Sequence, residues 1–176
     1  EIADRDWSSD VCSSDLKGDV TPHTIPDIMR DQKDGISICE YLREGRSAVG
    51  FRILKINRNG RFGHDISMAD RGFAKPAHLI KEGEKAVLEL TLVELEEYSR
   101  ITGKKMHGHL SGIKYIGENQ IHPLPIEDGT VRIPIQDCTY ERRAGGYMTG
   151  TVSLIMSGSV GNMHMPESSA LLVFWL

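Results

Sequence analysis

Residues 48–68 read AVGFRILKINRNGRFGHDISM, and this stretch decides the fold class. Its first part is rich in Val, Phe and Ile, and its last part carries apolar or aromatic side chains at alternate positions from Phe62 to Met68. The pair Asn59-Gly60 lies between the two parts, and a two-residue hairpin turn needs positive φ angles, which Asn and Gly adopt most easily. The stretch therefore predicts a β-hairpin.

The rest of the chain continues this pattern of short runs separated by turn residues. In the run 130–136, Pro134 cannot donate to a ladder, so that strand is expected at a sheet edge. The run 86–97 also has leucines at helical spacing, but its Val and Thr content favours a strand. Short helices are expected at 36–43 and at 76–84, the second behind a proline and before a glycine. The remaining strand-like runs are 107–116, 148–157 and 170–175.

These elements predict one all-β domain. It is expected to be a β-sandwich or a jelly-roll-like barrel of about seven to eight antiparallel strands with one or two short helices. The last run, residues 170–176, is apolar at every position, which is typical of a strand buried on both faces in the middle of a sheet. Two alternatives stay open: pairing with another subunit through Leu171, Val173 and Trp175, or a reading frame that continues beyond Leu176.

The first sixteen residues have a different origin. Residues 6–16 read DWSSDVCSSDL, which is what the end of a common sequencing-library adapter encodes in one frame. We therefore expect residues 1–16 to be a disordered artefact, residues 17–35 to be an N-terminal arm, and residues 36–176 to form the β-rich domain. Without the five acidic residues and one basic residue of this leader, the formal charge of −4 becomes zero, with 20 acidic and 20 basic residues.

Cysteine content and hydropathy add limits on the class of protein. Outside the leader only Cys39 and Cys138 remain, in no metal-ligand spacing, which favours two buried thiols over a disulfide. The longest apolar run has seven residues (170–176), far short of a membrane-spanning helix. The compartment is not indicated, and a secretion signal stays open because the adapter-like leader stands where it would lie.

The two histidines of the motif His107-Gly108-His109 have a spacing that is suitable for binding a metal ion. Side chains two apart on a strand share one face, so both imidazoles could meet one divalent metal ion. The motif resembles the two-histidine strand of cupin-type barrels, which implies a metal-dependent barrel enzyme. In that family a carboxylate follows closely, whereas here the next acid is Glu118. The third ligand is expected from His64, His122, His164 or Glu118.

The hairpin 48–68 also carries four basic side chains. With the flanking phenylalanines they could contact phosphates and bases of a nucleic acid. The corrected charge of zero argues against this reading, because non-specific binding needs several phosphates to be neutralised. The four residues are Arg52, Lys55, Arg58 and Arg61.

These observations favour a non-enzymatic binding or assembly module, such as a virus- or phage-derived structural protein, with no cofactor. The apolar last strand favours self-association or a protein partner, with neither nucleic acid nor membrane as a partner. The two alternatives are the metal-dependent enzyme using His107 and His109 and the nucleic-acid binder using the hairpin.

Overall fold

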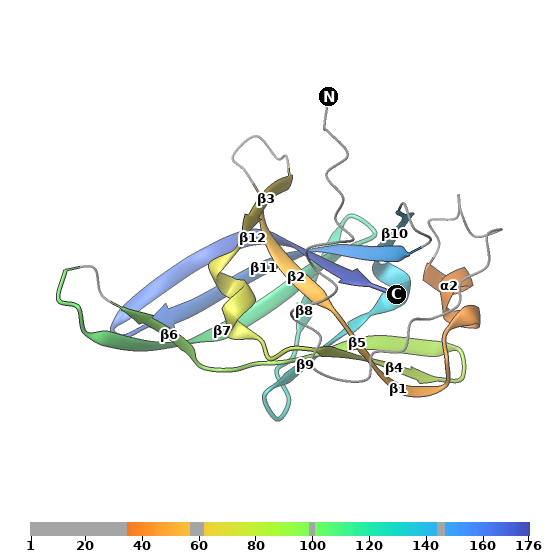
Figure 1. The fold of residues 1–176 in the computed structure, drawn as a ribbon, viewed down its shortest axis with the longest axis horizontal. Helices are drawn as coiled ribbons and strands as arrows, with labels where there is room; N and C mark the ends of the chain where they lie inside the picture. Colours follow the sequence, from red (N-terminus) through yellow and green to blue (C-terminus); the bar gives the residue numbers. More distant parts are fainter. Residues whose placement is uncertain (1–34, 57–61, 99–100, 144–146) are drawn as a thin grey trace.

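The computed structural model describes residues 35–56, 62–98, 101–143 and 147–176, which form a two-sheet antiparallel sandwich (Figure 1). One sheet has four strands in the order β1-β4-β5-β9, and the other has eight. The path through the larger sheet is β3-β2-β12-β11-β7-β6, with β10 beside β11 and β8 beside β7. The elements are α2 (Gly35–Tyr41), β1 (Gly45–Val49), β2 (Phe51–Ile56), β3 (Phe62–Ile66), the 3₁₀ helix η2 (Met68–Gly72), β4 (Ala77–Glu82), β5 (Lys85–Thr91), β6 (Leu95–Tyr98), β7 (Lys105–Gly117), β8 (Gln120–Leu124), β9 (Thr130–Pro134), the 3₁₀ helix η3 (Ile135–Asp137), β10 (Thr139–Arg142), β11 (Met148–Val160) and β12 (Met163–Trp175).

The core lies between the two sheets. Alternate side chains of each strand point into it, and the most enclosed ones are fully shielded from water. The smaller sheet contributes Leu88 and Ile133, and the larger sheet contributes Ile53, Leu154 and Phe174, each 0% exposed. Because the smaller sheet has half as many strands, it leaves part of the larger sheet uncovered. In Figure 1, β6 and the adjoining ends of β7, β11 and β12 extend beyond it.

The all-β sandwich confirms the expected fold class, and several finer predictions hold. Strands β2 and β3 pair antiparallel, as expected for the hairpin, whose turn at 57–61 lies outside the described residues. Helix α2 occupies the first expected helical segment. Strand β9, with Pro134 at its end, is at an edge of the smaller sheet. The proline therefore removes no interior ladder bond.

The last strand lies in the middle of the larger sheet. Strand β12 pairs with β11 on one side and with β2 on the other. Leu172 and Phe174 point into the core, whereas Leu171 and Val173 belong to a second apolar cluster with Leu54 on the opposite face. Burial on both faces explains why the run from Ala170 is apolar at every position.

The prediction of a helix at 76–84 is wrong. This segment forms β4, which lies between β1 and β5, with Ala77 and Leu79 buried at alternate positions. The features taken as helix ends serve the strand instead: Gly83, at φ +60°, is in the tight turn from β4 to β5. Strand pairing on both sides outweighs the weak local helix preference.

The expected number of strands is too low. The described residues contain twelve strands: β4 lies in the segment expected to be a helix, β8 and β10 were not recognised, and two expected runs are each divided between two strands. The run expected at 86–97 is divided between β5 in the smaller sheet and β6 in the larger one. The run expected to begin at Ala48 is likewise split at Gly50, between β1 and β2.

Cys39 and Cys138 are both buried thiols, and no disulfide joins them. Burial, and then the nearby carboxylate of Asp137, raises the pKa of the Cys138 thiol to about 12. Cys138 therefore stays protonated at neutral pH. Among the described residues, no helix is long and apolar enough to span a bilayer.

A buried carboxylate holds together the outer face of the smaller sheet. Glu89, 4% exposed, lies 3.0 Å from Nη2 of Arg46 and 3.0 Å from Nε of Arg132. His78 is directly opposite Glu89 on the neighbouring strand. Burial, and then the charge of Arg46, lowers the pKa of His78, which the charge of Glu89 offsets in part.

The lowered pKa of His78 predicts a loss of stability in mild acid. Below its ordinary pKa of about 6.5 the unfolded chain binds a proton at His78 more readily than the folded chain, so the free energy of unfolding falls as the pH falls. We expect His78→Gln to remove part of the difference in unfolding free energy between pH 7.5 and pH 5.5, measured by urea denaturation. The matched variant His164→Gln, at an exposed position, should leave that difference unchanged. If the two variants show the same difference in unfolding free energy between pH 7.5 and pH 5.5, His78 is not the source of the pH dependence.

Candidate functional site

The candidate site lies where the larger sheet extends beyond the smaller one, beneath η2. Ser67 caps the start of this helix, because its Oγ accepts a hydrogen bond from the backbone N–H of Ala69 at 3.3 Å. The backbone N–H of Ser67 donates to the carbonyl oxygen of Ile53 at 2.8 Å. The residue before η2 is thus joined to β2 by a backbone hydrogen bond of the kind that links neighbouring strands.

A buried aspartate fixes the remainder of η2. One Asp70 oxygen accepts the backbone N–H of Ile53 at 2.8 Å, and the other lies 2.7 Å from Nζ of Lys75 and 3.5 Å from Nη1 of Arg52. The Lys75 ammonium also lies 5.0 Å from the centre of the Phe51 ring. Burial lowers the pKa of Lys75, and the hydrogen bond to Asp70 opposes that shift. These contacts hold η2 against β2 through charge-assisted bonds.

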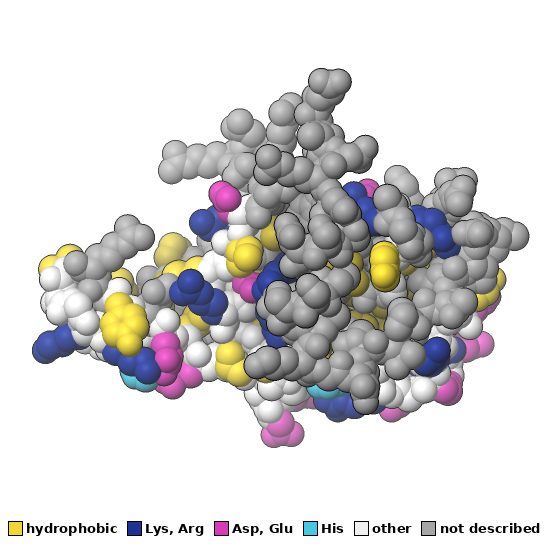
Figure 2. Space-filling view, in the orientation of Figure 1, with side chains coloured by type: hydrophobic (Ala, Val, Ile, Leu, Met, Phe, Trp, Pro, Cys, Tyr) yellow, Lys and Arg dark blue, Asp and Glu magenta, His cyan; other side chains and the backbone are white. Residues whose placement is uncertain are grey.

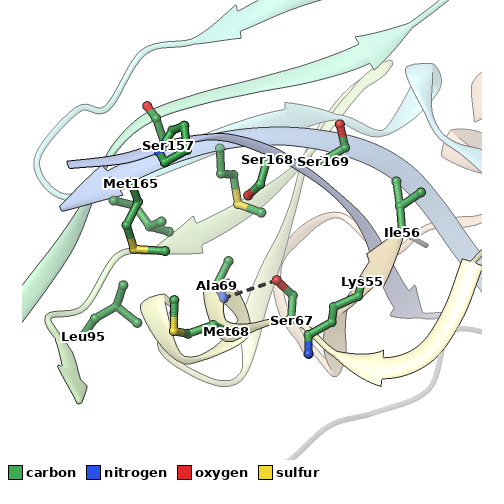
Figure 3. Close-up of a pocket in the computed structure, with 14 residues that line it drawn as sticks. Lys55, Ile56, Ser67, Met68, Ala69, Leu95, Ser157, Met165, Ser168 and Ser169 are labelled. Carbon is green, nitrogen blue, oxygen red and sulfur yellow. Dashed lines mark hydrogen bonds between the residues drawn. The ribbon is translucent and has the colours of Figure 1, made fainter. Parts of the chain in front are cut away.

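Between η2 and the inner face of the extended sheet lies a pocket of about 410 Å³. Figure 3 shows the side chains of Met68, from η2, and Met165, from β12, pointing into the same space. Leu95, Leu110 and Met156 complete its apolar walls, and all three are nearly inaccessible to solvent. The pocket is therefore a largely apolar concavity, which is the usual form of a small-molecule site.

A few polar groups lie at the edge of the pocket. In Figure 3, Ser168 and Lys55 are on the same side of the sheet as η2. By contrast, Ile56, Ser157 and Ser169 point to the opposite side of the sheet, although they also line the pocket. Lys55 supplies one positive charge at the edge of an otherwise uncharged lining. The arrangement suits a ligand with an apolar body and an acidic group.

Sequence reasoning did not find this pocket. Met68 of η2 is far in the chain from Met156 of β11 and Met165 of β12, so no local spacing indicates that the three methionines share a pocket. Lys55 was singled out, but for contact with nucleic acid. The fold alone brings these residues together.

The histidine pair lies on the opposite, outer face of the larger sheet. His107 and His109 alternate with the buried Leu110 along β7. Nδ1 of His107 lies 3.2 Å from Oε1 of Glu94, and Nδ1 of His109 lies 3.4 Å from Oγ of Ser159. Each imidazole thus has a polar neighbour that sequence reasoning did not expect.

Of the four expected third ligands, the three whose side chains the structure describes do not gather around this pair. His122 and Glu118 lie at the other end of β7, where the His122 ring stacks on Tyr115 with 4.9 Å between centroids. His164 lies one strand beyond Ser159, and the side chain of His64 is outside the described residues. Within the described ranges, no group of three His, Cys, Asp or Glu side chains is arranged to hold a metal ion.

The basic hairpin does not act as one surface in the described part. Arg52 faces Asp70 and Lys55 borders the pocket, whereas Arg58 and Arg61 lie outside the described residues. On the face drawn in Figure 2, basic and acidic side chains are interspersed where residues are described. Nucleic-acid binding stays a prediction.

The proposed subunit contact also stays a prediction. Leu171 and Val173 are each 7% exposed, and the partly buried Trp175 packs against their cluster. Trp175 also packs against the main core.

No protein-family model matches the sequence, and no curated protein matches it. Two similar solved structures are of one domain, the NEAT5 domain of IsdX2, a B. anthracis hemophore, in complex with heme. The domain itself is 14% identical, covers 75% of this chain and 96% of its own, and has a TM-score of 0.47. A mutant of the domain, also with heme, is 14% identical, covers 76% and 96%, and has a TM-score of 0.48. A likeness of this degree carries no functional argument, so the function is inferred from the pocket itself.

Proposed function

We propose that this chain is a non-enzymatic binding module that holds a flat, largely apolar small molecule with an acidic group. The observation that carries the proposal is the pocket of about 410 Å³ between η2 and the extended sheet. Its size is within the range of about 300–1,000 Å³ typical of small-molecule sites. The pocket walls are apolar and its few polar groups lie at the edge.

The methionines favour a flat, unsaturated ligand. Methionine side chains are flexible and polarisable, so they adapt to a ligand's shape and contact aromatic rings favourably. Met68 is 37% exposed and can adjust from the side of η2, whereas Met156 is only 2% exposed and forms a fixed wall. An aromatic or conjugated ring system between them would replace water with these contacts.

Lys55 favours an acidic ligand. Its ammonium can pair with a carboxylate that stays near solvent while the apolar body enters the pocket. Heme has this combination of a flat conjugated ring and two carboxylates, which makes it the first ligand to test.

The test compares two methionines of the same strand. Met165 lines the pocket, whereas Met163, two residues earlier, is 63% exposed and does not line it. We expect hemin to bind saturably, as followed by its visible absorbance, and Met165→Glu to weaken binding by about tenfold or more because a carboxylate would enter the apolar wall. Met163→Glu should bind as the original chain does. Equal binding by both variants, or no saturable binding by the unchanged chain, would refute the proposal.

The role of Lys55 is tested with an ester. Lys55→Ala should weaken hemin binding about two- to fivefold, the effect of one partly exposed ion pair. It should leave the binding of hemin dimethyl ester unchanged, because the ester offers no carboxylate. An equal loss for acid and ester would show that Lys55 acts through shape instead.

A further inference from the structure

Three of the seven methionines of the chain line this one pocket. They come from three separate elements, with Met68 in η2, Met156 in β11 and Met165 in β12. A thioether sulfur is a soft donor, and a methionine side chain has three rotatable bonds through which it can reach a common point. The clustering therefore supplies donors as well as apolar surface.

The described lining of the pocket lacks the side chains that harder metal ions prefer as ligands. The fourteen described residues that line the pocket include no His, Cys, Asp or Glu. Imidazoles and carboxylates are the ligands that favour Zn²⁺, Mg²⁺ and Ca²⁺, whereas thioethers favour Cu(I). The donor set is thus selective by its chemistry.

We propose that Met68, Met156 and Met165 bind a soft monovalent metal ion, Cu(I), through their sulfur atoms. The inference rests on the proposed function to the extent that it uses the same pocket. The exposed Met68 receives the ion from solvent, and the buried Met156 holds it away from water. Cu(I) suits neutral thioethers because it brings only one positive charge into an apolar site.

The charge of Lys55 should affect the binding of Cu(I) and of hemin in opposite directions, which a change of pocket shape alone would not do. Its ammonium is the one charged group among the fourteen described lining residues. It repels a cation and attracts an acid. Lys55→Ala is therefore expected to strengthen Cu(I) binding while it weakens hemin binding.

The experiment measures competition for Cu(I) between the chain and bicinchoninate under anaerobic conditions. All forms carry Cys12→Ser, which removes the leader thiol as a competing ligand, and the form with no other substitution is called the unchanged chain. The unchanged chain should withdraw one equivalent of Cu(I). The triple variant Met68→Leu, Met156→Leu, Met165→Leu removes the sulfurs but keeps the apolar volume. The matched control is Met106→Leu, Met148→Leu, Met163→Leu, which changes three methionines that do not line the pocket.

The pocket triple should bind Cu(I) at least about tenfold more weakly, and the control triple within about twofold of the unchanged chain. Equal Cu(I) affinities in the two triples, or no equivalent withdrawn by the unchanged chain, would overturn the proposal. Hemin binding separates this proposal from the preceding one, since leucine keeps the pocket apolar and the pocket triple should still bind hemin. Loss of Cu(I) with hemin retained supports the metal site, whereas Cu(I) binding without any hemin binding sinks only the small-molecule function.

Discussion

Asp70→Ala is expected to lower the free energy of unfolding by about 3–5 kcal/mol, the cost of removing one partner of a buried charge pair. The substitution leaves the backbone N–H of Ile53 without its acceptor and the ammonium of Lys75 without its nearest anion. In a chain of this length the melting temperature should fall by about 10 °C. Because Asp70 also fixes η2 over the pocket, hemin affinity should fall as well.

The matched control is Asp65→Ala, at an exposed carboxylate five residues earlier. It should change the melting temperature by less than about 2 °C. Asp70→Asn keeps an acceptor for Ile53 but loses the charge, so its melting temperature should lie between those of the two alanine variants. Equal melting temperatures for Asp65→Ala and Asp70→Ala would show that the buried carboxylate is not what holds η2.

Gly150→Ala is expected to destabilise the chain by about 3 kcal/mol, at the upper end of the cost of overpacking a core. Gly150 in β11 lies directly opposite Phe174 in β12, and a Cβ atom there would overlap carbons of the Phe174 ring. That ring cannot move aside easily, because it packs edge-on against Tyr140 with 6.1 Å between centroids. Urea denaturation gives the free energy directly.

A control and a rescue distinguish overlap from the general cost of changing a glycine. Gly112→Ala, on the neighbouring strand β7, brings a Cβ near only the hydroxyl of Ser157, which can rotate away. It should cost less than about 1 kcal/mol. Combining Gly150→Ala with Phe174→Leu should cost less than the sum of the two single changes, because the smaller side chain vacates the space that the Cβ needs. Strict additivity would contradict the proposed overlap.

The sequence predicted the parts of this fold that local chemistry determines. Asn59-Gly60 indicated the hairpin, the uninterrupted apolar run from Ala170 indicated a strand buried on both faces, and Pro134 indicated an edge. The segment after Pro76 misled because a proline before it and a glycine behind it are typical of helices as well as of turns. Only its pairing on both sides, with β1 and with β5, decides for the strand.

The candidate site was beyond sequence reasoning for a different reason. The histidine pair looked like a site because its two residues are adjacent on one strand, whereas the pocket is assembled from single methionines on η2, β11 and β12. A lone methionine in an apolar run is most simply a core residue. The distinction between core and pocket depends on whether a second layer covers it, which is a property of the whole fold.

The unequal size of the two sheets separates two kinds of selection on this chain. Residues between the sheets, such as Leu88 and Phe174, are tied to the stability of the whole domain. The pocket side chains of Met68 and Met165 lie where only η2 covers the larger sheet, so a change there alters what is bound before it alters whether the chain folds. Related chains can therefore diverge in ligand while they keep the same core, and their ligands should be inferred from this corner of the molecule and not from overall similarity.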